Sequence, residues 1–188
     1  MAEAAKQILS QTQRINRIVQ SLINFSRGGN ALASAQKDVS ISSAAEEAIQ
    51  LLTLSDEQQD LRFICDIDPT LRILGDHHQL LQVFLNLLSN ARDASPEGGT
   101  VSIRACANER EILVTISDQG EGIEENLRSR LFEPFVTTKD HGKGTGLGLW
   151  IVFNLVKSLG AEVALTSPAT NSDRGTTVTI SFPVSSAL

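Results

Sequence analysis

The chain has 188 residues, of which 41% are hydrophobic and 20% are charged, a composition typical of a globular protein with a buried core. A net charge of -6 and a pI near 5.1 disfavour duplex nucleic acid or an anionic membrane as the main partner, so an anionic ligand must be held by local geometry. The most apolar stretch, residues 147–156, is about half of the roughly 20 residues that a membrane span needs. We therefore expect a cytoplasmic fragment without direct membrane contact.

Cysteine and histidine are scarce. The two cysteines, Cys65 and Cys106, lie in strand-like stretches without metal-ligand spacing. We therefore expect both to be small core residues of a protein in a reducing compartment. Three histidines, His77, His78 and His141, leave few candidates for histidine-based catalysis.

The first predicted element is an amphipathic helix over residues 5–27, whose apolar residues recur at sevens, threes and fours. Its narrow apolar seam fits a partner helix, and packing against its own domain is the alternative. A Gly-Gly pair ends the helix. We therefore divide the chain into a partial helical segment (1–28), a linker (29–37) and a main domain (38–188).

The main domain mixes strands and helices. Strands are predicted at residues 38–41, 61–67, 71–74, 101–107, 111–117, 162–166 and 176–182. Helices are predicted at residues 43–54, opened by a Ser43–Glu46 capping box, at 76–94, with Asp76 as N-cap, and at 146–159. Because strands outnumber helices and a hairpin joins two of them, we expect an α+β two-layer sandwich, with a mixed, largely antiparallel sheet and helices on one face, after a long N-terminal helix.

The helix predicted at residues 76–94 has two contrasting faces. Its apolar arc comprises Leu80, Phe84, Leu87, Leu88 and Ala91, and its polar arc comprises Gln82, Asn86, Ser89, Asn90 and Asp93. The polar arc is either a solvated face or a binding face, and its amides favour binding because solvated faces usually carry Lys, Glu and Arg. Amide oxygens can complete a hydrated Mg2+ shell without adding charge.

Two glycine-rich segments follow. Asp118-x-Gly120-x-Gly122 ends an apolar strand, where glycine lets the backbone approach a flat ring and the carboxylate can accept from an exocyclic amine; by itself it is also an ordinary structural turn. Residues 139–149 carry four alternating glycines before an apolar helix, which favours an anion site at a helix N-terminus. The alternative is a mobile surface loop. A nucleotide lid would be both an anion site and a mobile loop, because it must move.

Together and in order, these segments resemble the ATP-binding catalytic domain of sensor histidine kinases from bacterial two-component systems, in the superfamily of DNA gyrase, heat-shock chaperone and MutL ATPases. Residues 82–91 resemble the N box, residues 118–122 and 142–149 the two glycine boxes, Phe132-Glu133-Pro134-Phe135 the F box and Arg174-Gly175-Thr176 the closing Gly-Thr element. The first helix resembles the second helix of the dimerisation and phosphotransfer hairpin of that family.

This resemblance implies an ATP and Mg2+ site. Asn90 would ligate Mg2+ and Asn86 would position the metal-bound triphosphate, so these two are the catalytic candidates. The adenine-binding candidates are Asp118, Gly120, Gly122 and Thr176. The remaining nucleotide-binding candidates are Asp93, Lys139, Lys143, Gly144, Thr145, Gly146, Leu147 and Gly148, with Arg92 as a further side-chain contact and Phe132 and Phe135 as anchors of the lid.

The resemblance also implies the reaction. Related ATPases place a water-activating Glu where this chain has Asn86, and an amide cannot act as a general base, which favours transfer to a protein acceptor. The expected acceptor is a histidine on the dimerisation helix of a homodimeric parent, followed by a response-regulator receiver domain. No acceptor-like histidine precedes Ile8, so this fragment should bind ATP without phosphorylating itself. The alternatives are a serine kinase of the anti-sigma-factor type and a non-catalytic nucleotide-sensing module.

Overall fold

The computed structural model describes residues 37–55, 60–139, 144–169 and 172–184. The predicted helix over residues 5–27 lies outside this part of the chain. The elements, in chain order, are β1 (Lys37–Ser40), α2 (Ile41–Ser55), β2 (Arg62–Asp66), β3 (Arg72–Gly75), α3 (His77–Ala94), β4 (Thr100–Ala107), β5 (Glu111–Ser117), α4 (Glu125–Arg128), α5 (Gly148–Ser158), β6 (Glu162–Thr166) and β7 (Thr177–Pro183).

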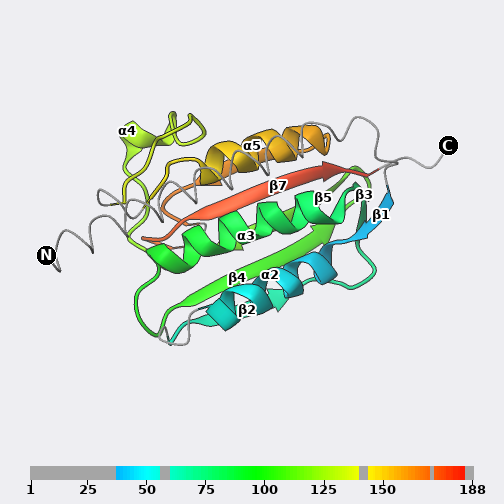
Figure 1. The fold of residues 1–188 in the computed structure, drawn as a ribbon, viewed down its shortest axis with the longest axis horizontal. Coiled ribbons are helices and arrows are strands. Elements are labelled where there is room, and N and C mark those ends of the chain that lie inside the picture. The colour runs from blue at the N-terminus through cyan, green and yellow to red at the C-terminus, as the bar shows by residue number, and fades with distance from the viewer. Residues whose placement is uncertain (1–36, 56–59, 140–143, 170–171, 185–188) are drawn as a thin grey trace, which may run out of the picture.

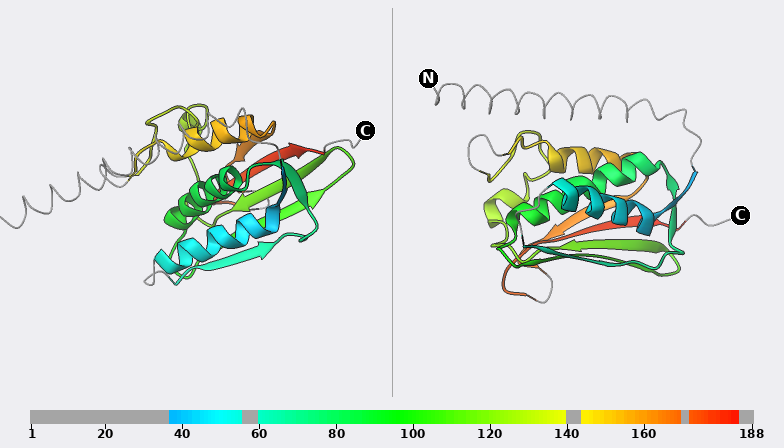
Figure 2. Two further views of the ribbon diagram at one scale, coloured as in Figure 1. Left: turned by 45° about the vertical axis from the view of Figure 1, so that its right-hand side comes forward. Right: turned by 60° about the horizontal axis from the view of Figure 1, so that its bottom comes forward.

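Two layers make up the domain. Five strands form one sheet in the order β2-β4-β5-β7-β6, in which β2 pairs with β4 in parallel and the other three pairs are antiparallel. The helices α2, α3 and α5 lie side by side over one face of this sheet (Figure 1, Figure 2). A separate antiparallel pair joins β1 to β3. This arrangement confirms the predicted α+β sandwich.

The core lies between the helices and the sheet. Alternate residues of β5 are buried and face the helices, as the period of two in a strand requires. The apolar arc of α3 meets them, and its largest residue, Phe84, is fully buried. The two faces predicted for this helix are therefore confirmed, and its polar arc remains on the other side.

Capping fixes where α3 begins and ends. The carboxylate of Asp76 accepts from the backbone N–H of Gln79 at 3.1 Å, as predicted for an N-cap. At the other end the N–H of Ser95 donates to the carbonyl of Ala91 at 3.1 Å. The buried apolar arc sets the rotation of the helix about its axis, and so the direction of its polar arc.

Two local predictions are wrong. The helix α2 begins at Ile41, because the hydroxyl of Ser40, and not that of Ser43, accepts from a first-turn N–H, at 3.3 Å. Cys65 and Cys106 are exposed free thiols and not core residues, since the first lies on an edge strand and the second on the face of β4 opposite to the buried Val101 and Ile103. The short helix α4 was not predicted.

None of the described helices is long and apolar enough to cross a membrane.

Candidate functional site

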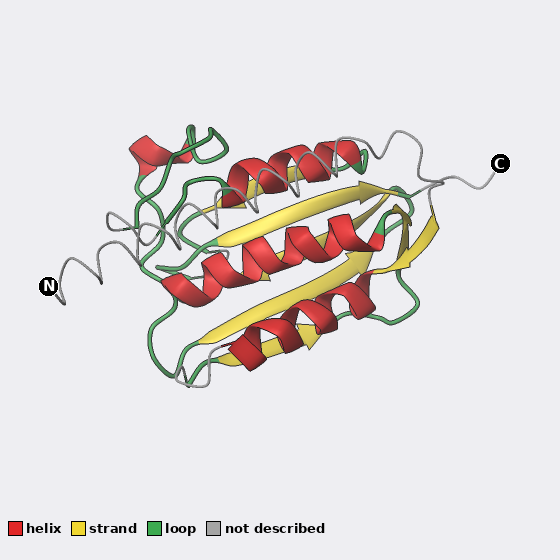
Figure 3. Cartoon of the chain, in the orientation of Figure 1, coloured by secondary structure: helices red, strands yellow, loops and turns green. Residues whose placement is uncertain are grey.

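A cleft of about 640 Å³ opens between α3 and α5, within the size range of small-molecule sites. Loops gather at this end of the molecule, where α3 ends and α5 begins (Figure 3). The polar residues that line the cleft are Gln82, Asn86, Ser89, Asn90, Asp93, Asp118, Thr137, Thr138, Lys139, Thr145 and Thr176. The cleft thus gathers the polar arc of α3 and residues of both glycine-rich segments.

One end of the cleft, here called the Asp118 end, is built on the sheet. Asp118 follows β5, and its Oδ1 accepts from the backbone N–H groups of Gly120 at 2.9 Å and Thr176 at 3.0 Å. The N–H of Asp118 in turn donates to the carbonyl of Thr176 at 3.0 Å. Because Oδ1 is committed to the backbone, Oδ2 is the oxygen left to accept a hydrogen bond from a ligand.

Burial governs the charge of Asp118. Desolvation raises the pKa of this carboxyl above its ordinary value, and the hydrogen bonds from Gly120 and Thr176 oppose the shift by stabilising the charged form. The carboxylate is therefore a strong hydrogen-bond acceptor in a partly buried position.

Three apolar side chains form a platform beside Asp118. Ile116 on β5 pairs with Val178 on β7, which pairs with Leu165 on β6, so the three lie side by side across neighbouring strands. All three line the cleft. A flat apolar surface next to a single carboxylate oxygen suits a ring that carries an amino group.

A buried hydroxyl supports this end, and the sequence reasoning missed it. Ser167 accepts from the N–H of Ile123 at 2.7 Å and donates to the carbonyl of Gly175 at 3.1 Å, which ties together two loops that border Asp118. Gly175 has a φ of 85°, and a Cβ there would collide with the carbonyl oxygen of Asp118. Glycine is therefore required at this position.

The opposite end of the cleft, here called the Asn90 end, is built on α3 and the start of α5. The side-chain Nδ2 of Asn86 donates to the carbonyl of Gln82 at 2.9 Å, which turns its Oδ1 away from its own helix. A Cβ on Gly148 would lie 3.5 Å from that Oδ1 and 3.6 Å from Nδ2 of Asn90. These distances place the first turn of α5 beside the two amides, and its backbone N–H groups have no side-chain cap.

Charged groups meet at the Asn90 end. The ammonium of Lys139 donates to Oδ2 of Asp93 at 2.6 Å and lies 3.5 Å from Oδ1 of Asn90. The guanidinium of Arg92 donates to the other oxygen of Asp93, from Nε at 3.1 Å and Nη2 at 3.0 Å. An amide oxygen and a carboxylate thus already face a cation here.

The loop before α5 is held by backbone contacts. The N–H of Phe135 donates to the carbonyl of Gly146 at 2.9 Å, and a Cβ on Gly146, whose φ is 67°, would collide with the backbone of Phe135. The Phe135 ring itself is 69% exposed, whereas Phe132 contacts the ring of Phe153 with centroids 5.6 Å apart. Phe135 therefore meets the loop through its main chain.

Most of the predicted site residues share the cleft. The residues that line it are Asn86, Asn90, Asp93, Asp118, Gly122, Lys139, Gly144, Thr145, Gly146, Gly148 and Thr176. Gly120 lies beside the lining, where a Cβ would come within 2.6 Å of the Ala94 carbonyl oxygen, and Leu147 is a buried core residue whose N–H donates to the Thr145 hydroxyl at 3.3 Å. Lys143 and His141 lie outside the described residues.

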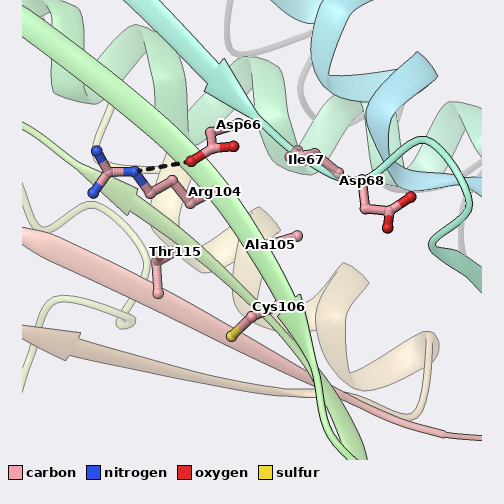
Figure 4. Close-up of a pocket in the computed structure, with 7 residues that line it drawn as sticks. All are labelled: Asp66, Ile67, Asp68, Arg104, Ala105, Cys106 and Thr115. Atoms are coloured by element: carbon pink, nitrogen blue, oxygen red, sulfur yellow. Dashed lines mark ion pairs between the residues drawn. The ribbon is translucent and has the colours of Figure 1, made fainter.

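A second hollow, of about 630 Å³, lies elsewhere, around Asp66, Arg104, Cys106 and Thr115 (Figure 4). Arg104 pairs with Asp66 at 3.7 Å and is the cross-strand neighbour of Thr115. These residues alternate with core residues of the same strands, so they lie on the face of the sheet that the helices leave uncovered. The hollow contains none of the predicted site residues.

Comparison with known proteins identifies the class. Residues 75–186 match the family described as histidine kinase-, DNA gyrase B- and HSP90-like ATPase. The chain is 45% identical to sporulation kinase A of Bacillus subtilis over 111 residues, which are 59% of this chain and 18% of that protein. It is 35% identical to the two-component sensor PprA of Pseudomonas aeruginosa in an alignment 193 positions long, which covers 98% of this chain and 20% of that protein.

Solved structures agree. The mycobacterial sensor histidine kinase MprB superposes with a TM-score of 0.70 at 28% identity, over 79% of this chain and 97% of that chain. Full-length ShkA in complex with AMPPNP gives a TM-score of 0.73 at 26% identity, over 89% of this chain and 35% of that chain. The chain therefore belongs to the histidine kinase-, DNA gyrase B- and HSP90-like ATPase family. Within that family it is a catalytic ATP-binding domain of the histidine-kinase type, and it spans about a fifth of the curated relatives named above.

Proposed function

We propose that this domain binds Mg-ATP in the cleft between α3 and α5 and transfers the γ-phosphoryl group to a histidine of its parent kinase, for relay to a response regulator in the cytoplasm. The observation that carries the proposal is the polarity of the cleft. A carboxylate oxygen beside an apolar platform lies at one end, and two amides facing a helix N-terminus lie at the other. This layout matches a purine joined to a triphosphate.

At the Asp118 end the chain would bind the base. Oδ2 of Asp118 would accept from the adenine amino group, while Ile116, Val178 and Leu165 would contact the ring. Thr176 fixes the carboxylate through its backbone N–H, so this contact requires little reorganisation.

At the Asn90 end the chain would bind phosphate and metal. No cluster of three or more His, Cys, Asp or Glu side chains able to hold a metal exists among the described residues, so Mg2+ would depend on nucleotide phosphates and water beside an amide oxygen. Asn90 fits this role, because its Oδ1 already lies 3.5 Å from an ammonium cation. Bound Mg2+ would neutralise charge on the triphosphate.

The acceptor histidine would come from another helix. His77 is paired with Glu47 at 2.7 Å, and it lies 13 residues before Asn90 on α3, which is about 20 Å along a helix. His78 is its neighbour in the same turn. Neither can reach the Asn90 end, which supports transfer to a histidine of the dimerisation helix in a homodimeric parent.

The experiment that tests the proposed function adds the acceptor helix as a separate molecule. The chain would be mixed with Mg-ATP and a separate polypeptide that carries the histidine-bearing helix of the parent kinase. Acid-labile phosphate on the polypeptide is the expected result. Nucleotide binding followed by acid-stable phosphoserine on a partner, or by no transfer to any histidine, would contradict the proposal.

A further inference from the structure

The partly exposed side chain of Lys139 points to α3. Its ammonium donates to Asp93 Oδ2 at 2.6 Å, and Asn90 Oδ1 lies 3.5 Å away. We propose that Asp93 is a positioning residue, which holds the Lys139 ammonium beside the metal-binding amide so that Mg-nucleotide must displace it to bind. This inference rests on the proposed function and deepens it.

Both partners of this ion pair are themselves fixed. Arg92 donates twice to Oδ1 of Asp93, so Oδ2 points to Lys139. The N–H of Lys139 donates to the hydroxyl of Thr137 at 3.2 Å. A Cβ on Gly144 would lie 3.2 Å from Cβ of Lys139, so the loop packs closely on the base of the lysine side chain. Neighbouring residues therefore hold both Asp93 and Lys139 in the positions that form the ion pair.

In this position the Lys139 ammonium competes with a metal ion for the amide oxygen of Asn90. An amide oxygen that lies beside an ammonium cannot also serve a metal ion without bringing two cations together, and like charges repel. A triphosphate without metal must draw Lys139 away from Asp93, and its negative charge is also repelled by the nearby Asp93 carboxylate. Mg2+ at Asn90 would repel Lys139 and release it toward the phosphates. Asp93 thus increases the dependence of nucleotide binding on Mg2+.

Calorimetry with a non-hydrolysable ATP analogue tests this, in Mg2+ and in EDTA, on the wild type, Asp93→Asn, Lys139→Met and the double variant. We expect Asp93→Asn to raise the affinity in EDTA roughly two- to fivefold, the range of a partly exposed ion pair, and to raise it less in Mg2+. The gain should vanish in the Lys139→Met background. Glu162→Gln is the matched control, since it removes the acid of a pair with Lys157 on the far part of α5 and β6.

Two results would overturn the inference. An equal change in Mg2+ and EDTA would mean a merely structural role for Asp93. A gain that persists without the lysine would mean that Asp93 acts only through its own charge. Failure of the wild type to bind nucleotide at all would instead overturn the proposed function, so the two failures are distinguishable.

A second readout needs no nucleotide. Acetylation with an amine-reactive reagent, followed by mass spectrometry, should modify Lys139 several-fold faster in Asp93→Asn than in the wild type, while Lys157 keeps its rate. In Glu162→Gln only Lys157 should change. Equal rates at Lys139 in the wild type and Asp93→Asn would contradict the proposed pairing.

Discussion

The two ends of the cleft are built by different means. At the Asp118 end, the backbone N–H groups of Gly120 and of Thr176, which lies 58 residues along the chain from Asp118, fix a carboxylate beside strands β5 and β7. At the Asn90 end, side-chain amides and an ion pair face a helix start and a loop. The first end is held by the sheet, and the second by charges that a ligand can rearrange.

This difference separates two tasks. A base can be recognised by a surface that is formed in advance, whereas a triphosphate with its metal brings charges that change the site it enters. Adenosine, which lacks phosphates, should therefore report on the Asp118 end alone. The difference between adenosine and ATP should report on the Asn90 end.

The largest expected effect is at the Asp118 end. Asp118→Asn replaces a charged acceptor with an amide and should weaken adenosine and ATP alike by about 1.5–3 kcal/mol, the usual range for a hydrogen bond to a charged group. Calorimetry would measure both ligands. An affinity for adenosine equal to that of the wild type would remove Asp118 from the adenine site.

A pair of glycine variants sharpens the comparison. Gly175→Ala forces a side chain into a left-handed backbone against Asp118, and should lower both stability and adenosine affinity, with a stability loss of about 1–3 kcal/mol. Gly146→Ala makes the same change against Phe135, and should lower ATP affinity while adenosine affinity is kept. Thermal unfolding and calorimetry would measure these changes. Identical ligand profiles for the two variants would contradict the division of the cleft.

A smaller effect is expected at the metal. Asn90→Ala should leave adenosine affinity unchanged and reduce the Mg2+-dependent part of ATP affinity by about 1 kcal/mol, the typical net value of one polar contact. Titrations with Mg2+ and with EDTA would separate the two terms. Equal losses in both would show that Asn90 does not act through the metal.

The smallest effect depends on pH. Because burial raises the pKa of Asp118, its carboxylate should begin to protonate, and adenosine affinity to fall, at a higher pH than for an exposed aspartate. The folded protein holds this proton more tightly than the unfolded chain, so acidification through this pKa favours folding and the loss is one of binding. Protonation of adenine affects wild type and Asp118→Asn equally, so their difference isolates Asp118. Parallel pH profiles for the two proteins would contradict this expectation.

Local sequence signals predicted the helices and strands well. The Asp76 cap predicted where α3 begins, and the apolar period predicted its two faces, because these features act within a few residues. The burial of Cys106 was mispredicted, since alternation along a strand shows which residues share a face but not which face the helices cover.

The contacts that complete the site are long-range. The motifs identified Asp118 and Thr176 as candidates and included Gly175 without a role. Only the fold shows that the aspartate accepts from the Thr176 N–H and that the glycine leaves room for it. Nothing near Ser167 in the sequence marks it as a link between two loops, and nothing joins Lys139 to Asp93 until α3 and the loop are placed together.

The most direct test is a crystal structure of the chain with a non-hydrolysable ATP analogue and Mg2+. The predicted result has the purine against Ile116, Val178 and Leu165, with its amino group at Asp118, and the metal at Asn90. A purine at the Asn90 end, or an analogue bound outside the cleft between α3 and α5, would contradict the account.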